Sequence, residues 1–141
     1  MRVFEIMSEG VETVKPSLLA SQARELMRQK QIHHMVVMDG SEVLGVLSDR
    51  DLGGPRLTQA AAGRAVSELM SSPAVTVDAN ALVTKAANVM RGRSIGSLVV
   101  TSAKTRVAGI VTVSDLLELV GRGAGRQPSR EARPPRRRRV G

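Results

Sequence analysis

Residues 45–51 of the chain read GVLSDRD, and residues 109–115 read GIVTVSD. Each stretch runs from a glycine through two apolar residues to a hydroxyl side chain, and an aspartate follows three residues later. The apolar part is typical of a strand that is covered on both faces, and the hydroxyl with its aspartate is typical of a helix start. Because the same pattern occurs twice, the chain contains an internal repeat.

The repeat extends in both directions from these two stretches. Residues 12–52 align with residues 75–116, with one extra residue near Thr105 in the second copy. In each copy an extended segment is followed by apolar residues at helical spacing, two short apolar runs and a second short helix. The matched apolar positions are Val14 and Val77, Leu19 and Leu82, Ala23 and Ala86, Met27 and Met90, and Ile32 and Ile95. The predicted order is β-α-β-β-α, twice, with Ser17 and Asn80 as helix N-caps.

One copy of about sixty residues would be marginally stable alone, because a chain of that size buries too little of its surface. We therefore expect one α/β domain of the α+β type, in which two repeats pack together with pseudo-two-fold symmetry. The first repeat is predicted at residues 1–60, with a linker to about residue 65. The second repeat is predicted at residues 66–121, and residues 122–141 are predicted to be a disordered basic tail.

The positive charge of the chain is concentrated in that tail. Residues 122–141 contain eight arginines and one glutamate, a net charge of +7, which leaves +1 of the total of +8 for the rest of the chain. A basic-patch argument for nucleic-acid binding therefore applies to the tail and not to the folded part. A tail of this kind would bind weakly, without sequence specificity and with strong salt dependence.

The composition excludes several classes of protein. There is no cysteine, which rules out disulfides and thiolate metal sites. No apolar run resembles a signal peptide or a membrane span, so we expect a cytoplasmic protein. No nucleophile stands beside an evident base and no Walker-type phosphate loop is present, so we predict no catalytic residues and no enzyme activity.

The repeated stretch itself is the candidate binding site. Free N–H groups at a helix start favour a phosphate, and the hydroxyl of Ser48 or Thr112 would add one hydrogen bond. The carboxylate of Asp51 or Asp115 could accept both hydroxyls of a ribose. The competing interpretation is a capping box, in which the same side chains only satisfy backbone groups at the helix start.

The ordered series of short motifs resembles the CBS domain family, whose members often carry two motifs as a Bateman module. The resemblance covers about residues 1–120 and appears in both copies. In the first copy it is carried by Met7-Ser8, Thr13-Val14-x-Pro16, Ala23-x-x-Leu26-Met27, Ile32-x-x-Met35-x-Val37 and residues 45–51. In the second copy it ends in residues 109–117.

The resemblance implies a regulatory module that binds AMP, ADP, ATP or S-adenosylmethionine in two clefts, with no catalytic cofactor. It also implies a homodimer and a separate effector protein. By position, the ribose would be held by Asp51 and Asp115, with Ser48 and Thr112 near the ribose and phosphate. The residues implied around the adenine are Ile32, His33, Ile95 and Gly96 as walls, with backbone near Ser8, Ser71 and Ser72 at its edge.

The chain departs from the family pattern at several positions. Val36 and Val99 replace the usual proline of the central strand, and the phosphate-side position carries His34 or neutral Ser97 in place of arginine. Polyphosphate binding is therefore in doubt, and the cleft with Asp115 and His34 is predicted to be the better anion site. Adjacent His33 and His34 would point to opposite faces of an extended segment, so no metal site is predicted.

Three functions remain open from the sequence. The first is a sensor of an adenine nucleotide or S-adenosylmethionine. The second is a structural interaction module of the same fold with empty clefts. The third is nucleic-acid binding through the tail.

Overall fold

The computed structural model describes residues 1–54, 56–104 and 106–125. The first half contains β1 (Thr13–Val14), α1 (Ala20–Lys30), β2 (His34–Asp39), β3 (Glu42–Ser48) and α2 (Gln59–Ala62). The second half contains β4 (Thr76–Asp78), α3 (Val83–Arg93), β5 (Ser97–Thr101), β6 (Gly109–Thr112) and α4 (Val113–Gly125). Two short 3₁₀ helices, η1 (Val3–Glu5) and η2 (Val66–Glu68), precede the two halves.

The two halves form matching three-stranded sheets, ordered β1-β2-β3 and β4-β5-β6. In each sheet the first two strands are parallel and the last two are antiparallel. The parallel pair needs a crossover, which α1 supplies in the first sheet and α3 in the second. The predicted β-α-β-β order and the mixed α/β class are confirmed.

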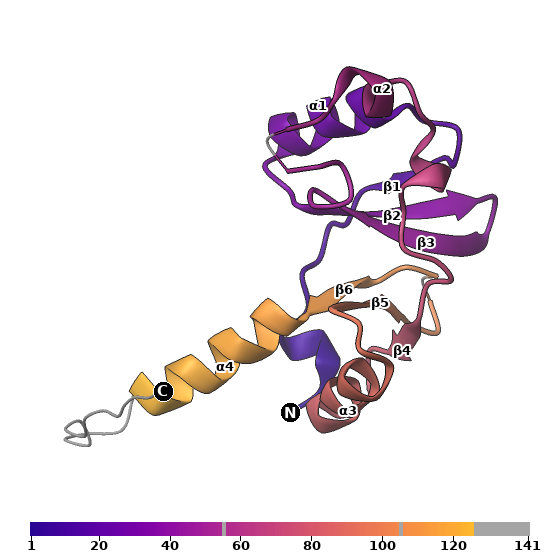
Figure 1. Cartoon of the computed structure of the whole chain (residues 1–141). Helices are drawn as coiled ribbons and strands as arrows, with labels where there is room; N and C mark the ends of the chain where they lie inside the picture. Colours follow the sequence, from indigo (N-terminus) through magenta and orange to yellow (C-terminus); the bar gives the residue numbers. More distant parts are fainter. Residues whose placement is uncertain (55, 105, 126–141) are drawn as a thin grey trace.

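The sheets face each other across a shared apolar layer, and helices cover their outer faces (Figure 1). Four residues from both central hairpins, Val36, Val46, Val99 and Ile110, form the layer between the sheets. Met35 and Val37, which flank Val36 along β2, belong instead to the core under α1. Alternation along a strand sends successive side chains to opposite faces, so both faces of each central strand are buried.

The N-terminal segment of each repeat packs on the other repeat. Val3 of η1 is fully buried in the core of the second half, and its N–H donates to the Ala81 carbonyl at 2.9 Å. Val66 of η2 is fully buried in the core of the first half, and its N–H donates to the Leu18 carbonyl at 2.8 Å. Each half of the sequence therefore completes the core of the other half.

The predicted N-caps Ser17 and Asn80 are wrong, because the cap residues of the two long helices lie two residues later, at Leu19 and Leu82. The later start of both helices is explained by the segments around η1 and η2, which we call the exchanged segments because each packs on the other repeat. Leu19 bridges to Ala65 and Leu82 bridges to Arg2, which keeps both cap residues extended.

The two repeats differ after their last strand. In the second repeat α4 follows directly, and it continues through residues 122–125, which the sequence assigned to the tail. In the first repeat the predicted helix at Ser48 is wrong, and residues 49–54 form hydrogen-bonded turns. Gly53 and Gly54 adopt φ values of +92° and +60°, which end any helix there. The rest of the predicted tail, residues 126–141, lies outside the described residues.

Candidate functional site

The glycine that opens each repeated stretch allows a close backbone approach. Val46 exchanges two backbone hydrogen bonds with Ser71, and Ile110 exchanges two with Ser8. A Cβ atom on Gly45 would lie 2.6 Å from the Ser71 carbonyl oxygen. The exchanged segments are thereby held against the ends of β3 and β6, next to the hydroxyl and aspartate of each stretch.

A Cβ atom on Gly109 would lie equally close, 2.5 Å from the Ser8 carbonyl oxygen. The same close approach thus occurs once in each repeat. The glycines need no positive φ here, since neither adopts one. Glycine is needed at these positions because a side chain would collide with the neighbouring carbonyl oxygen.

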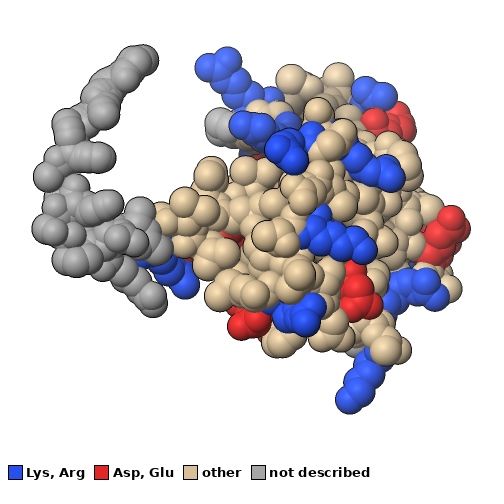
Figure 2. Space-filling view, turned by 90° about the horizontal axis from the view of Figure 1, so that it is seen from below, with Lys and Arg blue, Asp and Glu red and all other residues tan. Residues whose placement is uncertain are grey.

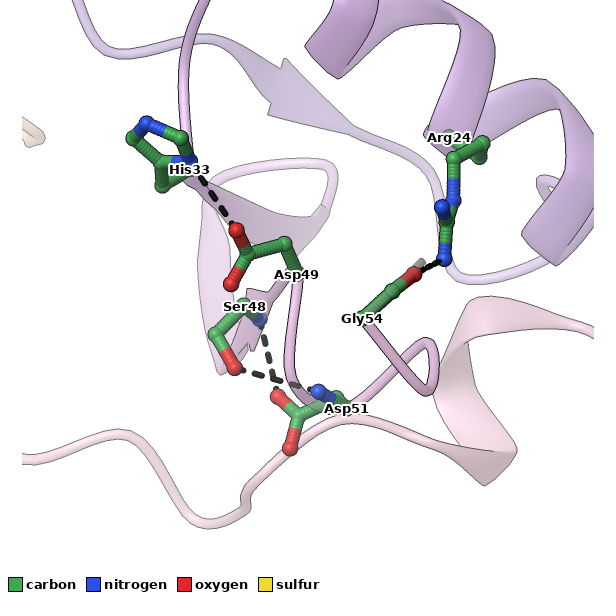
Figure 3. A network of polar contacts seen from close by, with 6 residues as sticks. All are labelled: Arg24, His33, Ser48, Asp49, Asp51 and Gly54. Carbon is green, nitrogen blue, oxygen red and sulfur yellow. Dashed lines mark hydrogen bonds and ion pairs between the residues drawn. The ribbon is translucent and has the colours of Figure 1, made fainter. Parts of the chain in front are cut away.

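The hydroxyl and carboxylate of each stretch form a reciprocal pair, as the capping interpretation requires. The Ser48 N–H donates to Asp51 Oδ2 at 2.8 Å, and the Asp51 N–H donates to Ser48 Oγ at 3.2 Å (Figure 3). Thr112 and Asp115 repeat both bonds at 2.8 and 3.2 Å. Among contacts between described residues, the other carboxylate oxygen, Oδ1, of each aspartate accepts no hydrogen bond, so it is available to a ligand.

One cleft, which we call the Asp51 cleft, has a volume of about 660 Å³. It brings together predicted residues from distant parts of the sequence, namely Ser48, Asp51, Ser71, Gly96, His34 and Thr112. Asp49, Arg50 and Ser114 also line it. None of these three residues was predicted to line the site, although they occupy the variable positions inside the repeated stretch.

A second cleft, which we call the Ser8 cleft, has a volume of about 430 Å³. Its predicted residues are Ser8, Ile32, His33, His34 and Thr112, and it is also lined by Glu9, Asp49 and Ser114. Volumes of both clefts fall in the range of about 300–1,000 Å³ that is typical of small-molecule sites.

Three predicted residues lie outside both linings. Asp115 is half-buried and reaches the clefts only through its partner Thr112, which lines both. Ile95 lines an apolar hollow between α3 and α4 instead. Ser72 borders neither cleft, whereas its neighbour Ser71 does.

His34 stands where the two clefts meet, since it lines both. Burial lowers the pKa of His34, and the nearby carboxylate of Asp49 opposes this shift. His33 contacts the same carboxylate directly, with its Nδ1 2.9 Å from Asp49 Oδ2 (Figure 3). Across the described part of the chain no three His, Cys, Asp or Glu side chains gather as a metal site would require.

The charges around the two clefts differ. His34 lines both clefts, and Arg50 lines only the Asp51 cleft. Glu9 lines only the Ser8 cleft. Among the described lining residues, the Asp51 cleft therefore has a basic side chain that the Ser8 cleft lacks. That the cleft with Asp115 and His34 is the better anion site stays a prediction, because Asp115 lines neither cleft.

No helix in the described residues is long and apolar enough to cross a membrane.

Comparisons with known proteins agree with this geometry. The family model described as "CBS domain" matches residues 3–52 and 66–122. A CBS domain-containing protein of Dictyostelium discoideum is 32% identical over 130 residues, covering 84% of this chain and 90% of that protein.

Two solved structures share the fold. The CBS domain pair of protein MJ0100, in complex with 5′-methylthioadenosine and S-adenosyl-L-methionine, has a TM-score of 0.74 and 23% identity, covering 90% of this chain and 98% of that one. CBSX2 in complex with AMP has a TM-score of 0.67 and 24% identity, covering 87% and 98%. The family match over both repeats and the shared fold lead to one conclusion: the chain belongs to the CBS domain family and carries two CBS motifs in tandem.

Proposed function

We propose that the chain is a non-catalytic regulatory module that binds an adenine nucleotide or S-adenosylmethionine in its two clefts. One observation carries the proposal: four residues that the sequence analysis nominated separately line a single cleft of about 660 Å³, namely Ser48, Asp51, Ser71 and Gly96. The adenosyl compounds held by the two fold neighbours support the same class of ligand. A separate effector protein would detect the change in packing between the repeats.

The Asp51 cleft offers complementary groups for each part of such a ligand. The free Oδ1 of Asp51 is suited to accept the ribose hydroxyls, because Oδ2 is already held by the Ser48 N–H. Arg50 and the N-terminal end of α4, at Val113 and Ser114, supply positive charge for a phosphate. In the Ser8 cleft, Ile32 offers an apolar wall and the backbone near Ser8 an edge for the base.

Calorimetric titration of the full chain with AMP, ATP and S-adenosylmethionine tests the proposal. We expect micromolar binding of at least one ligand. The variant Asp51→Asn keeps an oxygen for the Ser48 N–H but turns the free oxygen into a donor amide, so it should lose affinity about tenfold without a large loss of stability. Asp39→Asn, at the far end of β2, is the matched control. Absence of heat with every ligand at two temperatures would instead support a structural module with empty clefts.

Dimer formation is part of the proposal, with α4 as the contact surface. Val113, Leu117 and Val120 lie at helical spacing on α4 and expose 41%, 65% and 68% of their surface. The view from below shows this projecting helix as largely uncharged, whereas charges of both signs are interspersed over the rest of that face (Figure 2). Glu118 and Arg122 lie on the same helix and form an ion pair with each other at 3.3 Å, so this pair leaves no unpaired charge beside the stripe.

Light scattering at several concentrations tests this contact. The wild-type chain should have the mass of a dimer, and Leu117→Glu should be a monomer with unchanged ligand affinity. A monomeric wild type would contradict the dimer and leave the ligand proposal standing.

The charge of residues 122–141 supports nucleic-acid binding as a second candidate function. Removal of residues 126–141 leaves α4 complete and should abolish any binding to a DNA duplex at low salt. Unchanged binding by the truncated chain would reject this function for the tail.

A further inference from the structure

The two clefts are lined by different charges. Arg50 borders the Asp51 cleft, where it stands beside Asp49 and Asp51. The Ser8 cleft is lined by Glu9 and Asp49, and none of its described lining residues is a lysine or arginine. The acidic and basic residues of the Asp51 cleft (Asp49, Arg50 and Asp51) sum to −1, and those of the Ser8 cleft (Glu9 and Asp49) sum to −2. The Asp51 cleft is therefore less negative by one unit charge, and its described lining contains a guanidinium.

The histidines do not reverse this difference. His33 is directed at the carboxylate of Asp49, with its Nδ1 2.9 Å from Asp49 Oδ2. His34 borders both clefts, so it does not distinguish them, and burial lowers its pKa, which disfavours its charged form. Ser114 at the start of α4 also borders both clefts, so the helix dipole favours neither.

Volume does not separate the ligands, since either cleft is large enough for a nucleoside with a short substituent. Charge is therefore the property that decides. A phosphate dianion that enters a cleft with carboxylates and no guanidinium or ammonium loses its hydration without a compensating partner. A sulfonium or an uncharged substituent suffers no such loss, and a sulfonium gains from the carboxylates.

Building on the proposed function, we propose that the two clefts take different adenosyl ligands at the same time. The Asp51 cleft, which contains Arg50, takes a nucleoside monophosphate. The Ser8 cleft, which contains Glu9, takes an adenosyl compound without phosphate, either uncharged or a sulfonium. The two occupants meet at the shared wall formed by His34, Asp49, Thr112 and Ser114, where two phosphates would repel each other and a phosphate and a sulfonium would not.

The test is a competition titration of the full chain at pH 7.5. The chain is first saturated with AMP and then titrated with S-adenosylmethionine, and the order is then reversed. We expect one equivalent of each ligand to bind in both orders. Displacement of one ligand by the other at a single shared stoichiometry would overturn the assignment of two different clefts while leaving the proposed function intact.

Two exposed charges provide variants that should fold normally. Arg50→Gln should weaken AMP binding about tenfold and leave S-adenosylmethionine unchanged, because a charge-assisted contact to the phosphate is lost. Glu9→Gln should weaken S-adenosylmethionine about two- to fivefold, the size of an exposed charge pair, without weakening AMP. Lys85→Gln and Glu42→Gln make the same charge changes at exposed positions that line neither cleft, and both should match the wild type.

Each remaining outcome is decisive. Equal effects of Arg50→Gln on both ligands, or effects as large in the control variants, would show that the clefts do not discriminate by charge. If AMP binds with two equivalents per chain and S-adenosylmethionine does not bind, the charge assignment fails and the nucleotide module remains. If no adenosyl ligand binds to the wild type, the proposed function and this inference fall together.

Discussion

Replacement of Gly45 by alanine tests the interlocking of the two repeats directly. The added methyl group would lie 2.6 Å from the Ser71 carbonyl oxygen and 2.8 Å from Met70 Sδ. The methionine side chain can rotate away, but the carbonyl cannot. Ser71 is held by two backbone hydrogen bonds to Val46, at 2.9 and 3.0 Å, so relief of the clash must stretch that pairing.

The expected loss of stability follows from two opposing effects. Overpacking against a fixed group costs about 1–3 kcal/mol. Alanine recovers about 0.5–1 kcal/mol by restricting the unfolded chain. A net loss of about 1–2 kcal/mol corresponds to a melting temperature lower by roughly 4–8 °C for a domain of this size. Gly109→Ala should behave in the same way, because its methyl group would lie 2.5 Å from the Ser8 carbonyl oxygen.

Thermal unfolding followed by far-ultraviolet circular dichroism measures both variants. Gly92→Ala is the matched control, since Gly92 is exposed within α3 and a Cβ atom there meets nothing within 4 Å. That control should raise stability by about 0.5–1 kcal/mol through helix propensity. A Gly45→Ala protein as stable as the wild type would refute the close approach. Rescue by an added Met70→Ala change would show that the side chain, and not the carbonyl, is the obstacle.

Three further perturbations test other contacts. Burial lowers the pKa of His34, so above pH 6.5 the imidazole is neutral in both states, whereas below this value the unfolded chain gains a proton more readily. The free energy of unfolding should therefore fall as the pH drops from 7 towards 5. In urea unfolding, His34→Gln should show a weaker dependence of this free energy on pH than the wild type. An equal dependence in both proteins would count against this role of His34. Arg24 donates to the carbonyl of Gly54 (Figure 3) and also to that of Leu52. Arg24→Ala should therefore lose about 1.5–3 kcal/mol and speed amide exchange in that turn, and unchanged exchange would contradict this role. Val3→Ala should lose about 2 kcal/mol because Val3 is fully buried, and a silent change would argue against its packing.

The sequence predicted most of the fold because the repeat supplied two independent views of it. Apolar runs such as Met35-Val36-Val37 predicted strands buried on both faces, and this is confirmed by their division between the sheet interface and the core under α1. The exchange of η1 and η2 was not predicted. Alignment of the halves shows that the segments are equivalent, but it cannot show which copy each segment packs against.

Local propensity misled the prediction wherever tertiary contacts competed with it. Ser17 and Asn80 are good cap residues by type, yet pairing with residues 64–65 and 1–2 holds the chain extended beyond them. After Ser48, two glycines at positive φ and the Arg24 contacts replace a helix that the aligned Thr112 does begin. The position aligned with Arg24 is Ala87, which supplies no such contact and borders the open hollow beside α4.

Part of the candidate site could be nominated from the repeated stretch itself, namely Ser48, Asp51 and Thr112. The other predicted lining residues, such as Ser8, His34, Ser71 and Gly96, lie outside the stretch and followed only from the resemblance to the family. The charged residues Asp49 and Arg50 could not be assigned to the site in this way, because the pattern Ser-x-x-Asp does not determine the positions of the two intervening residues. Asp49 and Arg50 both line the Asp51 cleft, and only Asp49 also reaches the Ser8 cleft. That difference depends on the turn that replaces a helix after Ser48.

The capping and binding interpretations, which looked like rivals in the sequence, are compatible in the structure. Each aspartate uses one oxygen to hold the backbone of its own turn, and this bond fixes where the other oxygen points. A carboxylate that is already oriented loses little conformational freedom when a ribose arrives, so the cap makes the binding group more effective. The glycine at the head of the stretch allows the segment from the other repeat to come into contact, the hydroxyl closes the turn, and the aspartate keeps one oxygen free beside that turn. Under the proposed function, the same repeated motif of seven residues would therefore contribute both to the stability of the fold and to ligand binding.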